Sequence, residues 1–430
     1  MTRYRTGRLR RQFGQASLWM ISAGCMAAAL LAAPFVRWID DRTRWTLLGF
    51  APDGARAVLG ALTASLLTFI VFAFSLLLLA AQMASGQFTP RMVARVFEDR
   101  LTKLTVGAFV FSWVFAIAAL GRVEGRVPQL PVAAAILMSM ASLGLFLFLM
   151  QSSVKILRPV TMLTDVARDT RQVIETLYPA DFSSDGIKAA GPRPDPAQAR
   201  KTVLHPGRSG ALLSFDADGL ARIAGRADCT IEIVPEVGDF LATGEPLFRL
   251  SGPGAEAVSP RELRRGVALG PERTLEQDPA FGFRIIVDIA SKALSPAIND
   301  PTTAVLAIDQ LHQLLLVLAR KRLSDGVVRD GGGAVRLVYR TPDWEDFVAL
   351  AATEIRVYGA TSPQIGRRLQ AMFDHLLRTV PPERAPALRK EVALLERTIE
   401  RSYADPEDRA FALQGDLQGI GSRTKRRGVE

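Results

Sequence analysis

The chain has 430 residues, a formal net charge of +10 and a hydrophobic share of 49%, so it is long enough for more than one domain. A basic excess of this size often marks a nucleic-acid-binding protein, but most of it lies in residues 1–150, and residues 151–430 are nearly neutral. We therefore predict no nucleic-acid partner. The three His and two Cys match no zinc motif, so no metal site is predicted.

Four apolar segments occupy the first 150 residues, and none of them contains Asp, Glu, Lys, Arg or His. They cover residues 16–36, 57–81, 104–121 and 130–150. A helical rise of about 1.5 Å per residue lets each segment cross about 30 Å of hydrocarbon. The first segment is too long for the apolar part of a signal peptide, so we expect it to remain as a helix. The sequence predicts an α-helical membrane protein with four transmembrane helices in the lipid bilayer.

The Lys and Arg residues around these segments predict the orientation. Thirteen of them lie on the side of the N-terminus and six on the other side. By the positive-inside rule, both termini are predicted to be cytoplasmic.

The second apolar segment carries hydroxyl side chains and a row of small residues. Gly60, Ala64 and Thr68 are spaced by four, a pattern that favours close helix packing. Lining of a pore is the alternative role, for which the predicted residues are Ser65, Thr68 and Ser75.

The rest of the chain reads as a cytoplasmic α+β domain. Pro159 predicts a kink in the helix that follows the fourth segment, because proline removes a helical hydrogen bond. The predicted organisation is a four-helix transmembrane domain (1–150), a juxtamembrane stalk helix (151–178), a linker (179–200), a small β module (201–270), a mainly helical domain (271–417) and a basic tail (418–430).

Short apolar runs between turn residues predict strands over residues 210–215, 220–223, 230–234 and 245–250. Residues 237–250 resemble the second half of biotinyl/lipoyl-type barrel-sandwich domains, which attach their cofactor to a Lys. No Lys lies between Lys201 and Lys292. We therefore predict a barrel-sandwich-like β scaffold that carries no cofactor.

Helical periodicity dominates after residue 271. Predicted helices cover residues 281–294, 303–323, 343–358, 363–379, 383–403 and 406–417, with a strand at 334–339.

The densest polar cluster surrounds the first of these helices. Its predicted ligand-binding or interface residues are Arg273, Asp278, Arg284, Asp288, Lys292, Ser295, Asn299 and Asp300. Arg284, Asp288 and Lys292 are four apart and share one helix face, which fits an ion-pair ladder as well as a ligand or subunit contact. Asp300 followed by Pro301 predicts a helix N-cap, and the loop before it could also hold an anion. No catalytic residue is predicted, because no nucleophile motif is present, and we expect no enzyme activity.

Several separate runs resemble one family, the bacterial predicted membrane proteins grouped as domain of unknown function 2254. These runs are residues 87–91, 226–229, 273–284 and above all 293–301, with the sequence Ala-Leu-Ser-Pro-Ala-Ile-Asn-Asp-Pro. The resemblance spans nearly the whole chain. It implies a multi-pass protein of the bacterial inner (cytoplasmic) membrane and no particular activity.

Two functions fit these features. The first is an oligomeric channel or transport-related protein, a homo-oligomer that conducts a small ion and is gated or assembled by its cytoplasmic domain. The alternative is a membrane-anchored sensor or scaffold that binds a small ligand or a protein partner through the polar cluster at residues 284–300.

Overall fold

The computed structural model describes residues 18–43, 49–87, 100–123, 127–156, 158–182 and 199–420. The chain divides into two compact units, Met1–Thr161 and Met162–Glu430. Several predicted features lie outside the described residues: the basic N-terminus, most of the 87–91 motif, most of the linker and most of the basic tail.

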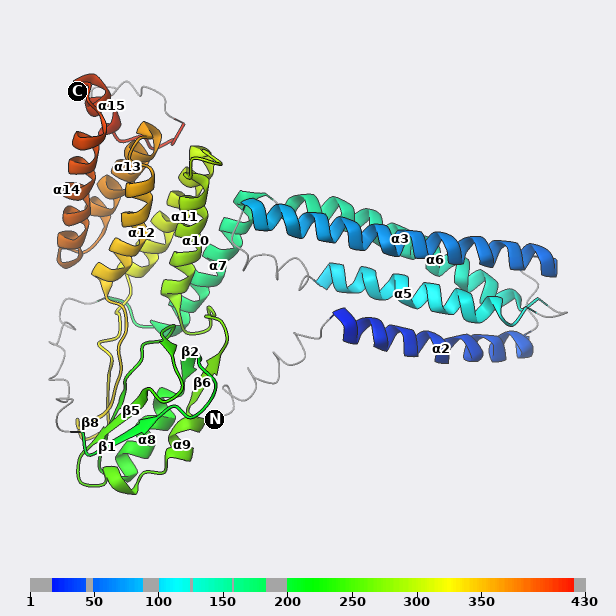
Figure 1. The fold of residues 1–430 in the computed structure, drawn as a ribbon, viewed down its shortest axis with the longest axis horizontal. Coiled ribbons are helices and arrows are strands. Elements are labelled where there is room, and N and C mark those ends of the chain that lie inside the picture. Colours follow the sequence, from blue (N-terminus) through cyan, green and yellow to red (C-terminus); the bar gives the residue numbers. More distant parts are fainter. Residues whose placement is uncertain are drawn as a thin grey trace. The chain divides into compact units, whose positions relative to one another are not determined.

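The described residues of the first unit form four long helices, which Figure 1 shows. Each forms from one of the four predicted apolar segments. The helix α5 packs against the other three and is the centre of the unit. The four helices are α2 (Leu18–Thr43), α3 (Pro52–Gln87), α5 (Arg100–Leu120) and α6 (Gln129–Ile156).

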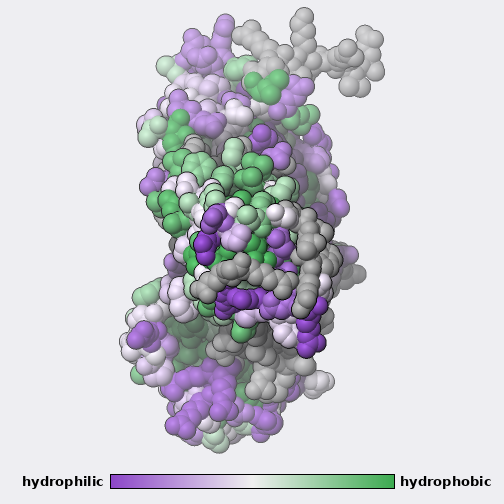
Figure 2. Space-filling view, turned by 90° about the vertical axis from the view of Figure 1, so that its right-hand side faces the viewer, coloured by the Kyte–Doolittle hydropathy of each residue, from purple (hydrophilic) through white to green (hydrophobic). Residues whose placement is uncertain are grey.

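The outward faces of these four helices are apolar. Leu31 of α2, Val71 of α3 and Leu147 of α6 all stay exposed, as expected for helices surrounded by lipid. The view in Figure 2 has hydrophobic side chains over the middle of the face that it presents. Inside the unit, small residues allow close packing: a Cβ added to Gly107 would lie 3.0 Å from the sulfur of Cys25.

Polar groups in this unit are used to join the helices. The buried carboxylate of Asp40 accepts a hydrogen bond from the backbone N–H of Leu130 (2.8 Å), one of the free donors at the start of α6. The guanidinium of Arg56 donates to the carbonyl of Val123 (2.7 Å), just beyond the end of α5. Ser112 and Ser142 share a buried hydrogen bond of 2.9 Å between α5 and α6.

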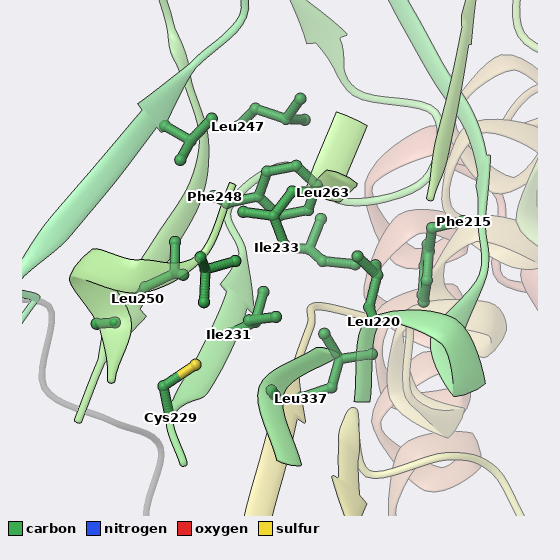
Figure 3. Packing of buried hydrophobic residues seen from close by; sticks show 14 of the residues in the cluster. Phe215, Leu220, Cys229, Ile231, Ile233, Leu247, Phe248, Leu250, Leu263 and Leu337 are labelled. Carbon is green, nitrogen blue, oxygen red and sulfur yellow. The ribbon is translucent and has the colours of Figure 1, made fainter. Parts of the chain in front are cut away.

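The described part of the second unit contains two sheets that share one hydrophobic core. Side chains of the larger sheet, such as Phe248 and Ile231, point toward Leu220 of the helix α8 (Ala217–Arg226) and Leu263 of the helix α9 (Pro260–Arg265) (Figure 3). The larger sheet has the order β1 (Lys201–Leu204), β5 (Pro246–Ser251), β3 (Thr230–Ile233), β8 (Val335–Val338), β7 (Val327–Arg329), and the smaller has the order β4 (Phe240–Leu241), β2 (Gly210–Phe215), β6 (Val267–Gly270).

Neighbouring strands are antiparallel except for β3 and β8, which are parallel. The hairpin of β7 and β8 comes from the segment that we assigned to the helical domain, and it completes the larger sheet. The predicted strands at 210–215, 230–234, 245–250 and 334–339 are confirmed within a residue or two.

The predicted strand at residues 220–223 is wrong, because this segment lies in α8. The side chain of Asp216 accepts a hydrogen bond from the backbone N–H of Gly219 (3.0 Å) and so caps the helix. Leu220 and Ala224, four residues apart, are both fully buried. The apolar spacing is therefore helical rather than alternating.

The remaining helices of the second unit form a packed α-helical region. Its members are α7 (Pro159–Leu177), α10 (Pro279–Ala293), α11 (Pro301–Ala319), α12 (Trp344–Tyr358), α13 (Pro363–Thr379), α14 (Ala385–Ser402) and α15 (Pro406–Ala412). The helix α11 packs against α10, α12 and α13. The predicted kink at Pro159 lies at a helix boundary, since α6 ends at Ile156 and α7 begins at Pro159.

Five described helices are long and apolar enough to cross a membrane: α2, α3, α5, α6 and α11. The buried share of the apolar window is 56% in α11, compared with 50% in α5, 33% in α6, 17% in α3 and 11% in α2.

A close approach between α7 and α10 depends on Gly282. A Cβ at this position would lie 1.9 Å from the hydroxyl oxygen of the buried Thr170. We expect Gly282→Ala to lower the free energy of unfolding by about 1–3 kcal/mol through overpacking. Adding Thr170→Ala should recover part of this loss. The measurement is thermal unfolding of the full-length protein in detergent, followed by circular dichroism.

The matched control is Gly225→Ala in α8, where no atom lies within 4 Å of the added Cβ. This variant should be neutral or more stable by up to about 1 kcal/mol, because Ala favours a helix over Gly. If Gly282→Ala unfolds at the same temperature as the wild type, the close approach of α7 and α10 is contradicted.

Candidate functional site

A cavity of about 240 Å³ lies within the second unit. We call it the Tyr178 cavity. It is formed where the end of α7, the β sheets, the start of α10 and the segment between β8 and α12 meet. Its lining includes Tyr178, Phe215, Glu236, Val237, Gln277, Asp278, Ser324, Tyr339, Arg340 and Thr341.

Two of the sequence motifs meet beside this cavity. Asp278 is 3% exposed, and its carboxylate accepts from the backbone N–H of Phe281 (2.9 Å) and pairs with Arg273 (3.2 Å). The guanidinium of Arg273 lies over Gly238, where a Cβ would come within 2.2 Å of it. Gly238 also has φ +96°, a conformation that favours glycine. The Val-Gly-Asp turn and the start of α10 are therefore fitted to each other.

Gln277 joins the start of α10 to the end of β2. Its side-chain amide accepts from the backbone N–H of Phe215 (3.0 Å) and donates to the carbonyl of the same residue (3.2 Å). The amide thus replaces a missing strand partner, which fixes this wall of the cavity.

The cavity brings opposite charges to its rim. The Oε2 atom of Glu236 and the Nη2 atom of Arg340 are 3.8 Å apart. Burial raises the pKa of Glu236, and Arg340 opposes this shift. The side chain of Arg340 is 60% exposed, and its Nη1 atom lies 3.8 Å from Oδ2 of a second carboxylate, Asp239.

Aromatic side chains form the deeper wall. The rings of Phe215 and Tyr339 have centroids 4.9 Å apart, and the hydroxyl of Tyr339 is 2.8 Å from that of Ser324. Burial raises the pKa of Tyr178 to about 12, although a hydrogen bond with Thr341 opposes the shift. The phenol therefore stays protonated at neutral pH and remains a donor. Opposite charges beside an aromatic wall can hold a small molecule that carries both charges.

Arg284 forms a second polar group, which ties α10 to α12. Its Nε donates to Asp288 (2.6 Å), and its Nη atoms make a two-pronged contact with Glu354, at 2.7 Å for the Nη2–Oε2 pair. The hydrogen bond from Arg284 lowers the pKa of Glu354. The predicted Arg284–Asp288 pair is present. Glu354 was not predicted, because it lies 70 residues away in the sequence.

The loop between α10 and α11 uses its polar groups internally. The Ser295 hydroxyl donates to the carbonyl of Lys292 (2.7 Å), in the last turn of α10. Asn299 has φ +47°, and Asp300 accepts from the backbone N–H of Thr303 (3.1 Å). The predicted N-cap at Asp300 is confirmed. Of the eight predicted site residues, one, Asp278, lines the Tyr178 cavity.

Tyr178, Glu236, Tyr339 and Arg340 were missed by the sequence reasoning. Glu236 directly precedes the Val-Gly-Asp turn, which was a usable signal, whereas Arg340 has no local motif.

The three predicted pore residues lie on the outward face of α3. Ser65, Thr68 and Ser75 are all exposed within the single chain. The hydroxyls of Thr68 and Ser75 donate to carbonyls of their own helix, at 3.0 and 2.9 Å.

His312 and His375 form a pair between α11 and α13, with a ring nitrogen distance of 2.8 Å. Burial, together with Arg368 and His375, lowers the pKa of His312 to about 4, so its ring is neutral at pH 7. In the described part of the chain, no group of three or more His, Cys, Asp or Glu is arranged to hold a metal ion.

The two carboxylates around Arg284 should act together. All three side chains are partly exposed, so Asp288→Ala and Glu354→Ala should each cost about 1 kcal/mol or less of unfolding free energy. The double variant should cost more than the sum, because each single variant leaves Arg284 one partner. Chemical denaturation of the wild type, the two single variants and the double variant measures these free energies of unfolding. Strict additivity would show that the two carboxylates act independently.

The comparisons with known proteins agree with this architecture. The family model described as predicted membrane protein (DUF2254) matches residues 15–375. An uncharacterized protein of Mycobacterium tuberculosis and one of Mycobacterium bovis are each 31% identical over 374 residues, which is 84% of this chain and 71% of the relative. No solved structure matches the chain. The chain therefore belongs to the bacterial family of predicted membrane proteins named DUF2254.

Proposed function

We propose that the protein is a membrane-anchored sensor that binds a small zwitterion in the Tyr178 cavity. The observation that carries this proposal is the pairing of Glu236 and Arg340 at the rim of a cavity with an aromatic wall. The carboxylate accepts from an ammonium group, and the guanidinium binds a carboxylate in a two-pronged contact. The apolar part of the ligand packs between Tyr178 and Tyr339.

The size of the cavity limits the ligand. Its volume of about 240 Å³ lies below the range of about 300–1,000 Å³ that is typical of drug-sized ligands. A free amino acid has the right charges and a fitting size.

The sensing step uses α7. Tyr178 directly follows the last residue of this helix, Leu177. The helix begins at Pro159, three residues after α6 ends at Ile156. A ligand that bridges Tyr178 and the segment after β8 restrains the end of α7. The restraint passes along the chain to the last apolar helix of the first unit.

The membrane arrangement belongs to the same proposal. The helices α2, α3, α5 and α6 cross the bacterial inner membrane, with both termini in the cytoplasm. The helix α11 stays outside the bilayer, which its packing against three neighbouring helices supports. The two sheets act as a barrel-sandwich-like scaffold around one core. The protein is not an enzyme.

Ligand binding should raise the unfolding temperature. The probe is a panel of the free protein amino acids, added singly to the full-length protein in detergent. A ligand at about 100 times its Kd adds about 2.7 kcal/mol of stability, which a thermal scan resolves. Arg340→Gln and Glu236→Gln should reduce the shift.

Glu345→Gln is the control, because it removes a carboxylate from an exposed pair with Lys390 outside the cavity. The proposal fails if no amino acid shifts the midpoint, or if the shift survives in both cavity variants.

A second candidate function is an oligomeric channel for a small ion. The outward hydroxyls of Ser65, Thr68 and Ser75 support it, as does Gly60, around whose Cβ position no atom lies within 4 Å. Copies of the chain that meet along this face of α3 place the hydroxyls around a common axis.

The channel requires measurable ion flux from liposomes that contain the purified protein. Replacing Thr68 and Ser75 by Leu should lower this flux by blocking the hydroxyl face. Replacing Leu147, on α6, by Ile serves as the control. A flux equal to that of protein-free liposomes would exclude the channel.

A further inference from the structure

An apolar groove of about 590 Å³ runs along the first unit between α2, α5 and α6. We call it the α5 groove. Its lining is almost entirely hydrocarbon, and it includes Ile21, Ala108, Phe111 and Met138. The two polar features of its lining are Lys103 near the start of α5 and the Ser112–Ser142 pair.

The length of the α5 groove matches one leaflet of a bilayer. Lys103 and Ser112 are nine residues apart on the same helix, which is about 14 Å at the helical rise. Half of a hydrocarbon core of about 30 Å is close to this value. The groove therefore extends from the level of the lipid headgroups, where α5 begins, to about the middle of the membrane.

The chemistry at the two ends points to one occupant. The ammonium of Lys103 has three donors, so it can bind a phosphate oxygen together with another partner. At the other end of the groove, the hydroxyls of Ser112 and Ser142 form a hydrogen bond with each other (2.9 Å), so they need no hydrogen bond from the bound molecule. A cationic end and an apolar length are complementary to an anionic phospholipid.

We propose that the α5 groove binds one acyl chain of an anionic phospholipid and that Lys103 contacts its phosphate. A lipid headgroup supplies the anion that the charge of Lys103 favours, which an apolar helix face of a second copy does not. The bound lipid seals α2 against α5 and α6 and makes their packing depend on lipid composition.

Native mass spectrometry tests the site on the full-length protein, purified from bilayers of equal phosphatidylglycerol and phosphatidylcholine. Wild type should retain phosphatidylglycerol in preference to phosphatidylcholine. Lys103→Gln should lower this preference about fivefold, which corresponds to about 1 kcal/mol for one Lys near anionic headgroups. Ala108→Trp should remove one retained lipid of either kind, because the indole fills the groove.

Two variants serve as matched controls. Arg158→Gln removes an exposed cation that follows α6, and Ala64→Trp adds an indole to the exposed face of α3. Neither should change the retained lipid. If Ala108→Trp fails to fold, Ala108→Leu supplies a smaller obstruction.

Equal lipid retention by wild type, Lys103→Gln and a folded Ala108 variant would overturn the proposal. So would an equal loss of preference in Arg158→Gln, since the effect would then come from net charge alone. Binding of amino acids in the Tyr178 cavity involves none of these residues, so the two proposals fail independently.

Discussion

The buried carboxylate of Asp278 is the contact on which the Tyr178 cavity depends. A carboxylate that is 3% exposed loses most of its hydration, which costs free energy unless other groups replace the water. Here a backbone N–H at the start of α10 and the guanidinium of Arg273 replace it. Because Arg273 also covers Gly238, the same contact sets the turn that carries Glu236 against the start of α10. One charge thus positions a helix end, a turn and a cavity wall.

Local patterns predicted most helices and several strands because burial repeats with a fixed period in each. They failed at residues 220–223, which were assigned to a strand but belong to a short helix whose N-cap is Asp216. Asp300–Pro301 was identified as a helix start, and Asp278–Pro279 carries the same signal. Contacts between segments that are distant in the sequence produce no local sequence pattern. Glu354 and Arg340 come to their partners only through the packing of α12 and β8, which no local pattern encodes.

The helix α11 differs in its packing from the apolar helices α2 and α3 of the first unit. It has the length and apolar character of a span, yet Leu311, Leu315 and Leu318 are fully buried against other helices of the second unit. In α2 and α3, by contrast, large apolar side chains such as Leu31 and Val71 remain exposed. The hydrophobic effect favours burial in both cases, but the apolar partner differs: neighbouring helices in one unit and, for a protein of this family, lipid in the other.

The close packing of α7 gives the proposed sensing step a physical basis. Gly282 leaves just enough room for Thr170, so a shift of α7 along α10 would create a steric clash rather than a gradual change. Packed interfaces of this kind hold discrete positions, because side chains fit one another in only a few arrangements. A ligand at Tyr178 contacts the segment that follows the same helix. Ligand binding therefore acts on α7, which has few allowed positions. The ligand can shift the equilibrium between these positions only by as much as its affinity for each position differs.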